Sequence, residues 1–89
     1  MVKVINEVYY SSRFNKSFQK ISPRIKKKFF SLEKDFRKDC YAIQLKTHRL
    51  KGNYKDYCSF SVTYSYRVVF EFYKDGVLLV DIGTHAIYK

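Results

Sequence analysis

The chain has 89 residues, which is enough for one small domain and too few for two. Its hydrophobic content of 46% and aromatic content of 19% exclude a disordered chain, because so much apolar surface would not stay in contact with water. The net charge of +10 favours a polyanionic partner: nucleic acid, the ribosome, an acidic membrane or an acidic protein. The alternative is a solvated surface that only keeps the protein soluble. Residues 1–50 hold 13 Lys or Arg against 4 Asp or Glu, whereas residues 51–89 hold 5 against 4.

The first half of the chain predicts a strand followed by a two-helix hairpin. Apolar side chains recur at every second position from Met1 to Tyr10, apart from Asn6, and this is the period of a strand. Ser11-Ser12 can cap a helix, and Ser22-Pro23 can begin a second one, because proline suits the first helical turn. The apolar face of the first helix would be formed by Phe14, Phe18 and Ile21, and that of the second by Ile25, Phe29, Leu32 and Phe36.

The second half predicts strands joined by tight turns. Cys40–Leu50 fits neither period and stays unassigned, and a loop follows at 51–56. Alternating apolar side chains predict strands over 57–62, 66–73 and 77–82. Lys74-Asp75-Gly76 joins the last two, because Asp-Gly supplies the positive φ that hairpin turns need. We therefore expect one α+β domain over residues 1–89, in which a three-stranded antiparallel meander forms a curved sheet covered on one face by the helices.

The cysteines and the apolar runs bear on the environment of the protein. Cys40 and Cys58 form no CxxC pair and have no metal-ligand spacing, so we expect neither a disulfide nor a zinc site but two partly buried thiols. No secretion signal and no membrane-length apolar run is visible. These features favour a cytoplasmic protein without a membrane partner.

Three residues could take part in chemistry on a phosphate. His48 and His85 are the two histidines, and imidazoles on either side of a phosphodiester can act as base for the 2′-OH and acid for the leaving 5′-oxygen. The guanidinium of Arg67, alone in an apolar strand, could stabilise charge on the phosphorane oxygens. Such chemistry requires no metal or other cofactor. The alternatives are two unrelated surface histidines and a salt bridge between Arg67 and Glu71.

Several tyrosines and lysines are open to two interpretations. Tyr88, Tyr54 and Tyr57 could stack on bases, or they could pack against the protein itself. The run Lys26-Lys27-Lys28 is typical of a solvated helix face, and it could also contact ribosomal RNA or an acidic partner.

Four blocks, in this order, resemble the RelE/ParE superfamily of type II toxin–antitoxin toxins, and most closely its YafQ-like mRNA interferase branch. They are Leu45-Lys46-Thr47-His48-Arg49-Leu50-Lys51-Gly52, Tyr57-Cys58-Ser59-Phe60-Ser61-Val62, Tyr66-Arg67-Val68-Val69-Phe70-Glu71-Phe72 and Asp81-Ile82-Gly83-Thr84-His85. Each block alone is weak, but their order and spacing, ending in Gly-Thr-His, are fairly specific. The resemblance covers nearly the whole chain.

The resemblance implies a metal-free, ribosome-dependent endoribonuclease that cuts mRNA by 2′-OH transesterification. The segment 81–88 would lie at the centre of its active site, with His85 as the main acid or base. His48 would share the proton transfer, and Arg67 would contact the phosphate. Tyr88 would orient the substrate. Further substrate contacts are expected from Lys51, Tyr66, Ser61 and Ser65.

The pattern departs from the resembled branch at two positions. Ser61 stands where that branch can carry a histidine, and Ser65 where it can carry an aspartate, and serine is a poor proton-transfer group. The spacing from His85 to Tyr88 is also one residue short, which leaves the position of Tyr88 open. A basic RNA-binding module without catalysis therefore stays an alternative.

The resemblance also implies partners. We expect a cognate antitoxin, encoded beside this chain, and mRNA held on the ribosome. The free chain would be a monomer and would enter a higher-order complex with the antitoxin. The main alternative is a ParE-type inhibitor of DNA gyrase, which shares this fold but has no nuclease activity.

Overall fold

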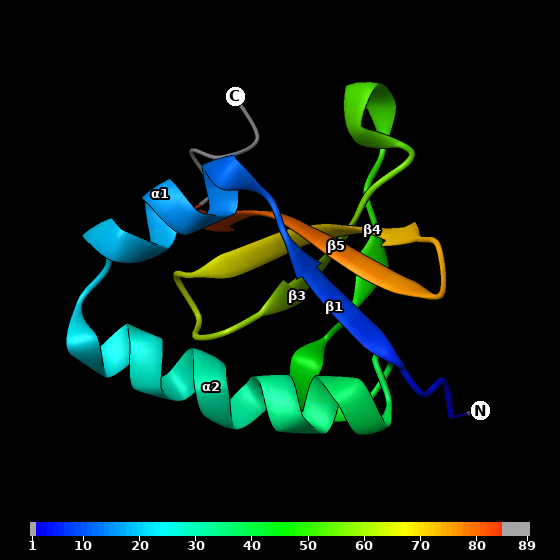
Figure 1. Ribbon diagram of the computed structural model, residues 1–89, viewed down its shortest axis with the longest axis horizontal. Helices are drawn as coiled ribbons and strands as arrows, with labels where there is room; N and C mark the ends of the chain where they lie inside the picture. The colour runs from blue at the N-terminus through cyan, green and yellow to red at the C-terminus, as the bar shows by residue number, and fades with distance from the viewer. Residues whose placement is uncertain (1, 85–89) are drawn as a thin grey trace.

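The computed structural model describes residues 2–84 as a five-stranded sheet with two helices packed against it (Figure 1). The elements are β1 (Glu7–Tyr10), α1 (Ser12–Lys20), α2 (Pro23–Lys38), β2 (His48–Arg49), β3 (Cys58–Ser61), β4 (Arg67–Tyr73) and β5 (Gly76–Gly83), with short 3₁₀ turns at Ile43–Leu45 and Gly52–Tyr54. The strands lie in the order β1-β5-β4-β3-β2. Only β1 and β5 are parallel, so the sheet is mixed.

The two helices begin where the sequence predicts. Ser11 Oγ accepts a hydrogen bond from the backbone N–H of Phe14 at 2.9 Å, and Ser22 Oγ accepts one from Ile25 at 3.3 Å. Each serine thereby satisfies a donor that the first helical turn leaves unpaired, and Pro23 occupies the first turn of α2. The prediction of a strand followed by a pair of helices is confirmed.

The core lies between α2 and the sheet. Phe36 of α2 contacts Phe60 of β3 and Phe70 of β4, with ring centroids 4.8 and 5.1 Å apart. The apolar faces predicted for both helices supply the helical part of this core, and its fully buried members include Phe14, Phe29, Phe36, Phe60, Phe70, Leu45 and Leu79. The α+β class with two N-terminal helices is therefore confirmed.

The first helix continues the line of β1 along the edge of β5. β1 pairs with β5 as far as Tyr10 and Leu79. From there Ser11 donates from its backbone N–H to the carbonyl of Leu79 at 3.0 Å and from its hydroxyl to the carbonyl of Val80 at 2.7 Å. The C-terminal half of β5 is thus bordered by α1, and side chains of α1 reach the sheet face opposite α2.

The three-stranded meander is an incomplete prediction. Cys40–Leu50, left unassigned by its pattern, contains the 3₁₀ turn Ile43–Leu45 and the strand β2. His48 pairs with Ser59 and Arg49 with Cys58 in antiparallel register, so the second half of the chain contributes four strands. A two-residue strand is too short to show alternation, which is why periodicity did not reveal it.

The predicted strand over 1–10 is too long. Only Glu7–Tyr10 pairs with the sheet. Ahead of it, the backbone N–H of Ile5 donates to the carbonyl of Arg37 at 2.9 Å, and the N–H of Cys40 donates to the carbonyl of Lys3 at 3.0 Å. The N-terminal segment therefore crosses the C-terminal end of α2, and its alternation reflects this packing and not a sheet ladder.

The β4–β5 hairpin lies where it was predicted, but its glycine has a different role. The positive φ of 52° belongs to Lys74, and Gly76 is already in β5. A Cβ atom added at Gly76 would lie 1.8 Å from the carbonyl oxygen of Glu7. Glycine is needed there because the backbone of β1 passes directly beside it.

Both cysteines are free and buried, as predicted. Burial raises the pKa of the Cys40 thiol to about 11 and also raises the pKa of Cys58. Along residues 2–84 no helix is both long and apolar enough to cross a lipid bilayer.

Candidate functional site

The sheet face opposite α2 carries the predicted polar residues in two neighbouring rows. One row runs across the strands through His48, Ser59, Val69 and Asp81. The next row contains Ser61, Arg67 and Gly83. Side chains directly opposite one another on neighbouring strands project from the same face. His48, Ser61 and Arg67 therefore share a face, and strand spacing puts the Cα atoms of His48 and Arg67 about 12 Å apart.

Within residues 2–84 Arg67 has only neutral hydrogen-bond partners. Its Nη1 donates to Ser61 Oγ and, at 3.5 Å, to the carbonyl oxygen of Thr63. The alternative of a salt bridge to Glu71 is not what the structure has, since the one ion pair found within residues 2–84 joins Arg13 to Asp81. Neutral partners orient a guanidinium without cancelling its charge, which leaves it able to bind a phosphate.

A basic cavity surrounds this arginine. It has a volume of about 330 Å³ and lies between α2, the segment before β2 and the β3–β4 turn. Among the described residues three cations and no carboxylate line it: the lining residues are Lys28, Leu32, Gln44, Lys46, Ser61, Val62, Thr63, Tyr64 and Arg67. A polyanion entering this cavity would meet positive charge from three separate segments of the chain.

His48 is exposed on the edge strand and has an oriented ring. Its Nδ1 lies 3.1 Å from the carbonyl oxygen of Lys46. A proton on Nδ1 can donate to this carbonyl, and the lone pair of Nε2 is then directed elsewhere and can accept a proton. Lys46 itself has a φ of 53°, a left-handed turn that leads from the 3₁₀ turn into β2. This local geometry is compatible with the tautomer of His48 in which Nε2 accepts a proton.

The remaining predicted site residues are distributed more widely. Ser61 contacts Arg67 directly, whereas Ser65 is exposed in the turn between β3 and β4. Tyr66 is half-buried and packs against the core, and Lys51 is exposed ahead of the 3₁₀ turn Gly52–Tyr54. His85 and Tyr88, and the part of segment 81–88 beyond Thr84, lie outside the described residues.

Sequence reasoning missed how Asp81 is held. Its Oδ1 accepts hydrogen bonds from Ser17 Oγ at 2.6 Å and from the backbone N–H of Ile82 at 2.8 Å. Its Oδ2 pairs with Arg13 Nε at 3.0 Å. The signal was a lone acid inside the apolar run of β5, which needs a partner when buried, but the sequence did not indicate which cation would supply it.

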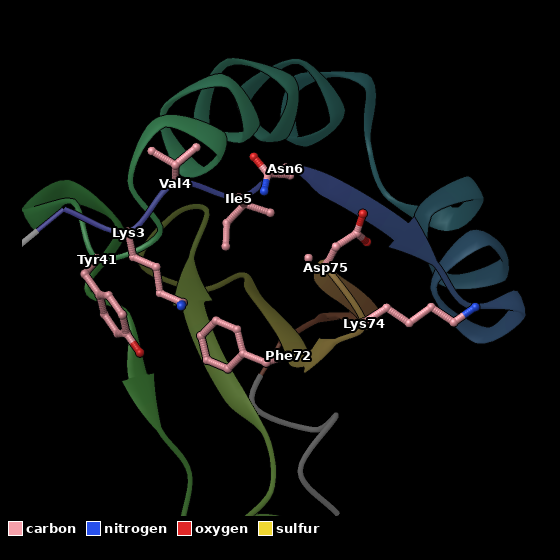
Figure 2. A pocket seen from close by; sticks show the side chains of 9 residues that line it. Lys3, Val4, Ile5, Asn6, Tyr41, Phe72, Lys74 and Asp75 are labelled. Carbon is pink, nitrogen blue, oxygen red and sulfur yellow. The ribbon is translucent and has the colours of Figure 1, made fainter.

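A larger hollow lies elsewhere on the described surface. It has a volume of about 480 Å³ and is lined by the N-terminal segment, Tyr41 and the β4–β5 hairpin. Figure 2 shows the Lys3 side chain extending toward the Phe72 ring, and its Nζ lies 5.2 Å from the ring centroid. Its lining includes Asp75 as well as Lys3 and Lys74, and none of the predicted site residues that lie within residues 2–84. Size alone does not make it the candidate site.

Metal ligands do not gather in the part of the chain that is described. Across residues 2–84 no group of three or more His, Cys, Asp or Glu side chains could hold a metal ion.

Solved structures with the same fold come from bacterial toxins. No family model and no curated protein matches the chain. The crystal structure of YafQ from E. coli strain BL21(DE3) has a TM-score of 0.76 at 20% identity, over 92% of this chain and 96% of that one. The YoeB/ParE toxin from Agrobacterium tumefaciens has a TM-score of 0.75 at 19% identity, over 89% of this chain and 98% of that one. YafQ in the E. coli DinJ–YafQ toxin–antitoxin complex has a TM-score of 0.74 at 20% identity, over 94% of this chain and 97% of that one.

This chain has the fold of the RelE/ParE toxins. The resemblance inferred from the four sequence blocks is therefore confirmed at the level of the fold. At about 20% identity the match shows the fold alone, and the activity has to be inferred from the residues of the site.

Proposed function

We propose that this chain is the toxin of a type II toxin–antitoxin pair and cleaves mRNA on the ribosome. The observation that carries the proposal is the charged Arg67 in a cavity that Lys28 and Lys46 also line, with His48 two strands away in the same sheet. Cations bind a scissile phosphate, and an imidazole transfers a proton to or from it. The shared fold with YafQ and YoeB/ParE toxins is consistent with this chemistry.

In the proposed reaction the 2′-OH attacks the neighbouring phosphorus and the 5′-oxygen leaves. His48 and His85 share the two proton transfers, and Arg67 stabilises the charge that develops on the phosphorane oxygens. Tyr88 orients the substrate. The products are a 2′,3′-cyclic phosphate and a 5′-hydroxyl end. The chain's own side chains supply each of these roles, with no cofactor.

The cellular setting of the proposal follows from its substrate. A ribosome-dependent nuclease acts in the cytoplasm, and its host requires a means of blocking it. YafQ has been crystallised with DinJ, and a YoeB–YefM complex is known from Staphylococcus aureus. We propose a comparable antitoxin for this chain, with an acidic segment that complements the net charge of +10.

The test is cleavage of mRNA on purified ribosomes, read as mapped 5′ ends. Wild type should cut, and His85→Ala and His48→Ala should each cut at least about 10²-fold more slowly, the scale for losing one acid–base group. Lys34→Ala, an exposed α2 lysine outside the basic cavity, is the matched control and should cut normally. Intact transcripts accompanied by broken DNA in expressing cells would instead identify a gyrase inhibitor.

A further inference from the structure

A small cleft lies on the same sheet face as His48, and its described lining includes neither His48 nor Arg67. Its volume is about 90 Å³. The chain segments that form it are the start of α1, the loop before β3 and the central strands. Its lining consists of Arg13, Tyr54, Tyr57, Val69, Val80 and Asp81. A basic side chain and two aromatic rings thus converge over an apolar floor.

The position of Arg13 in this cleft is fixed by a buried carboxylate. Arg13 Nε lies 3.0 Å from Asp81 Oδ2, and the side chain of Asp81 is 8% exposed whereas that of Arg13 is 67% exposed. Asp81 is itself held by Ser17 and by the backbone of Ile82. The guanidinium has further N–H donors on Nη1 and Nη2, beyond the one on Nε that faces Asp81.

The two tyrosines are held as a pair by the backbone. The N–H of Tyr57 donates to the carbonyl of Tyr54 at 2.9 Å, which closes the turn that carries both rings. The ring centroids lie 6.4 Å apart at an interplanar angle of 50°. Both side chains are half-buried, so part of each remains exposed to solvent. Rings ordered in this way can stack on a ligand with little loss of conformational entropy.

The cleft lies on the same sheet face as His48. Val69 and Asp81 of its lining belong to the cross-strand row that begins at His48. The pairing of β2 with β3 extends to Tyr57, whose carbonyl accepts from the N–H of Leu50 at 2.9 Å. Three strand spacings separate the Cα atoms of His48 and Asp81, a distance of about 14 Å. One single-stranded RNA segment could therefore contact both places.

We propose that this cleft is a stacking subsite for single-stranded RNA, which extends the proposed nuclease function and rests on it. One base beside the cleavage point stacks on Tyr54 or Tyr57. The Nη groups of Arg13 donate to the neighbouring phosphate. Aromatic rings next to a guanidinium are the combination that binds single-stranded nucleic acid without strict sequence preference. The competing explanation is that the tyrosines only shield Val69 and Val80 from water.

The test separates binding from cleavage. Fluorescence anisotropy would measure the affinity of the purified chain for a short labelled RNA with 2′-O-methyl riboses, which cannot undergo transesterification. The double variant Tyr54→Leu/Tyr57→Leu should bind at least about tenfold more weakly, because stacking is lost. Tyr54→Phe/Tyr57→Phe retains both rings and should bind within about twofold of wild type. Tyr41→Leu removes an exposed tyrosine of the separate 480 Å³ hollow and serves as the matched control.

The outcomes distinguish the subsite from the nuclease. The subsite is overturned if the double Leu variant binds the RNA as tightly as wild type, or if the double Phe variant binds as weakly as the double Leu variant. It is also overturned if wild type has no measurable affinity for the RNA. Loss of affinity only in the Leu pair supports it, and thermal melting checks that this variant remains folded. If ribosomal cleavage is absent in wild type while the Leu pair still loses affinity, the nuclease proposal fails and RNA stacking stands.

Discussion

The two faces of the sheet differ in their content of polar side chains. The face beneath α2 is almost entirely apolar, with Phe36 packed on Phe60 and Phe70. The titratable groups in this core are Cys40 and Cys58, and burial raises the pKa of each, which keeps both thiols neutral. Charge is thus excluded from the side of the sheet that provides most of the buried apolar contacts.

The opposite face holds charge and supplies partners for it. Asp81 is buried yet ionically paired with Arg13, and Ser59 is fully buried. Arg67 contacts only neutral oxygens among the residues described. Throughout residues 2–84 no buried side-chain nitrogen or oxygen lacks a hydrogen-bond partner. The apolar face mainly provides stability, and the polar face mainly provides the candidate chemistry. A substitution on one face should therefore leave the property that the other face provides largely unchanged.

The largest expected effect is on the apolar face. Phe36→Ala removes a ring that is 1% exposed and should lower the free energy of unfolding by about 3–5 kcal/mol, from lost burial and the cavity left behind. Urea denaturation would measure the loss. Ribosomal cleavage per folded molecule should stay near that of wild type. A loss of cleavage larger than the loss of folded protein would contradict the division of stability and chemistry between the two faces.

The second effect concerns the polar face, where a substitution should lower the rate of cleavage but not the stability. Arg67→Gln should slow cleavage by about 10²-fold, as expected for removing one transition-state donor, while the free energy of unfolding changes by no more than about 1 kcal/mol. Mapped cleavage on ribosomes and urea denaturation would measure the two quantities. Lys34→Gln, on the outer part of α2, is the charge-matched control. Equal cleavage by both variants would contradict the role of Arg67.

Much of the apolar face could be predicted because its signals are local. The spacing of Ile25, Phe29, Leu32 and Phe36 indicates a helix with one buried side, and all four are buried. Ser22-Pro23 indicates where that helix begins. Such patterns depend on residues a few positions apart, and the fold preserves them.

The polar face could be predicted only in part because its contacts join distant segments. Arg13 and Asp81 are 68 positions apart, and the helix around Arg13 would look the same with any other partner. β2 has only two residues and is defined by pairing with β3, which no local pattern records. The shared location of His48 and Arg67 came from the family resemblance, since spacing alone left them unrelated.

The third effect tests how the polar face holds a buried charge. Asp81→Asn retains the shape of the side chain but replaces charge-assisted hydrogen bonds with neutral ones. The free energy of unfolding should fall by about 1–2 kcal/mol, with only a modest share from the ion pair because Arg13 is largely exposed. Asp75→Asn, at an exposed turn position, is the control and should change it by less than about 0.5 kcal/mol. Identical urea curves for the two variants would contradict the structural role of Asp81.

The smallest effect tests the exclusion of charge from the core. The pKa of Cys40 is about 11 in the folded chain, above its ordinary value of 9.0, because burial disfavours the thiolate. An unfolded chain therefore loses this proton first as the pH rises, and stability is full below about pH 9 and declines toward pH 11. Between pH 8 and pH 10.5 wild type should lose on the order of 1 kcal/mol more unfolding free energy than Cys40→Ala. Cys58 is present in both proteins, so its own titration cancels in the difference. Parallel pH profiles would mean that the core tolerates a thiolate, and the contrast between the two faces would then rest on shape and not on charge.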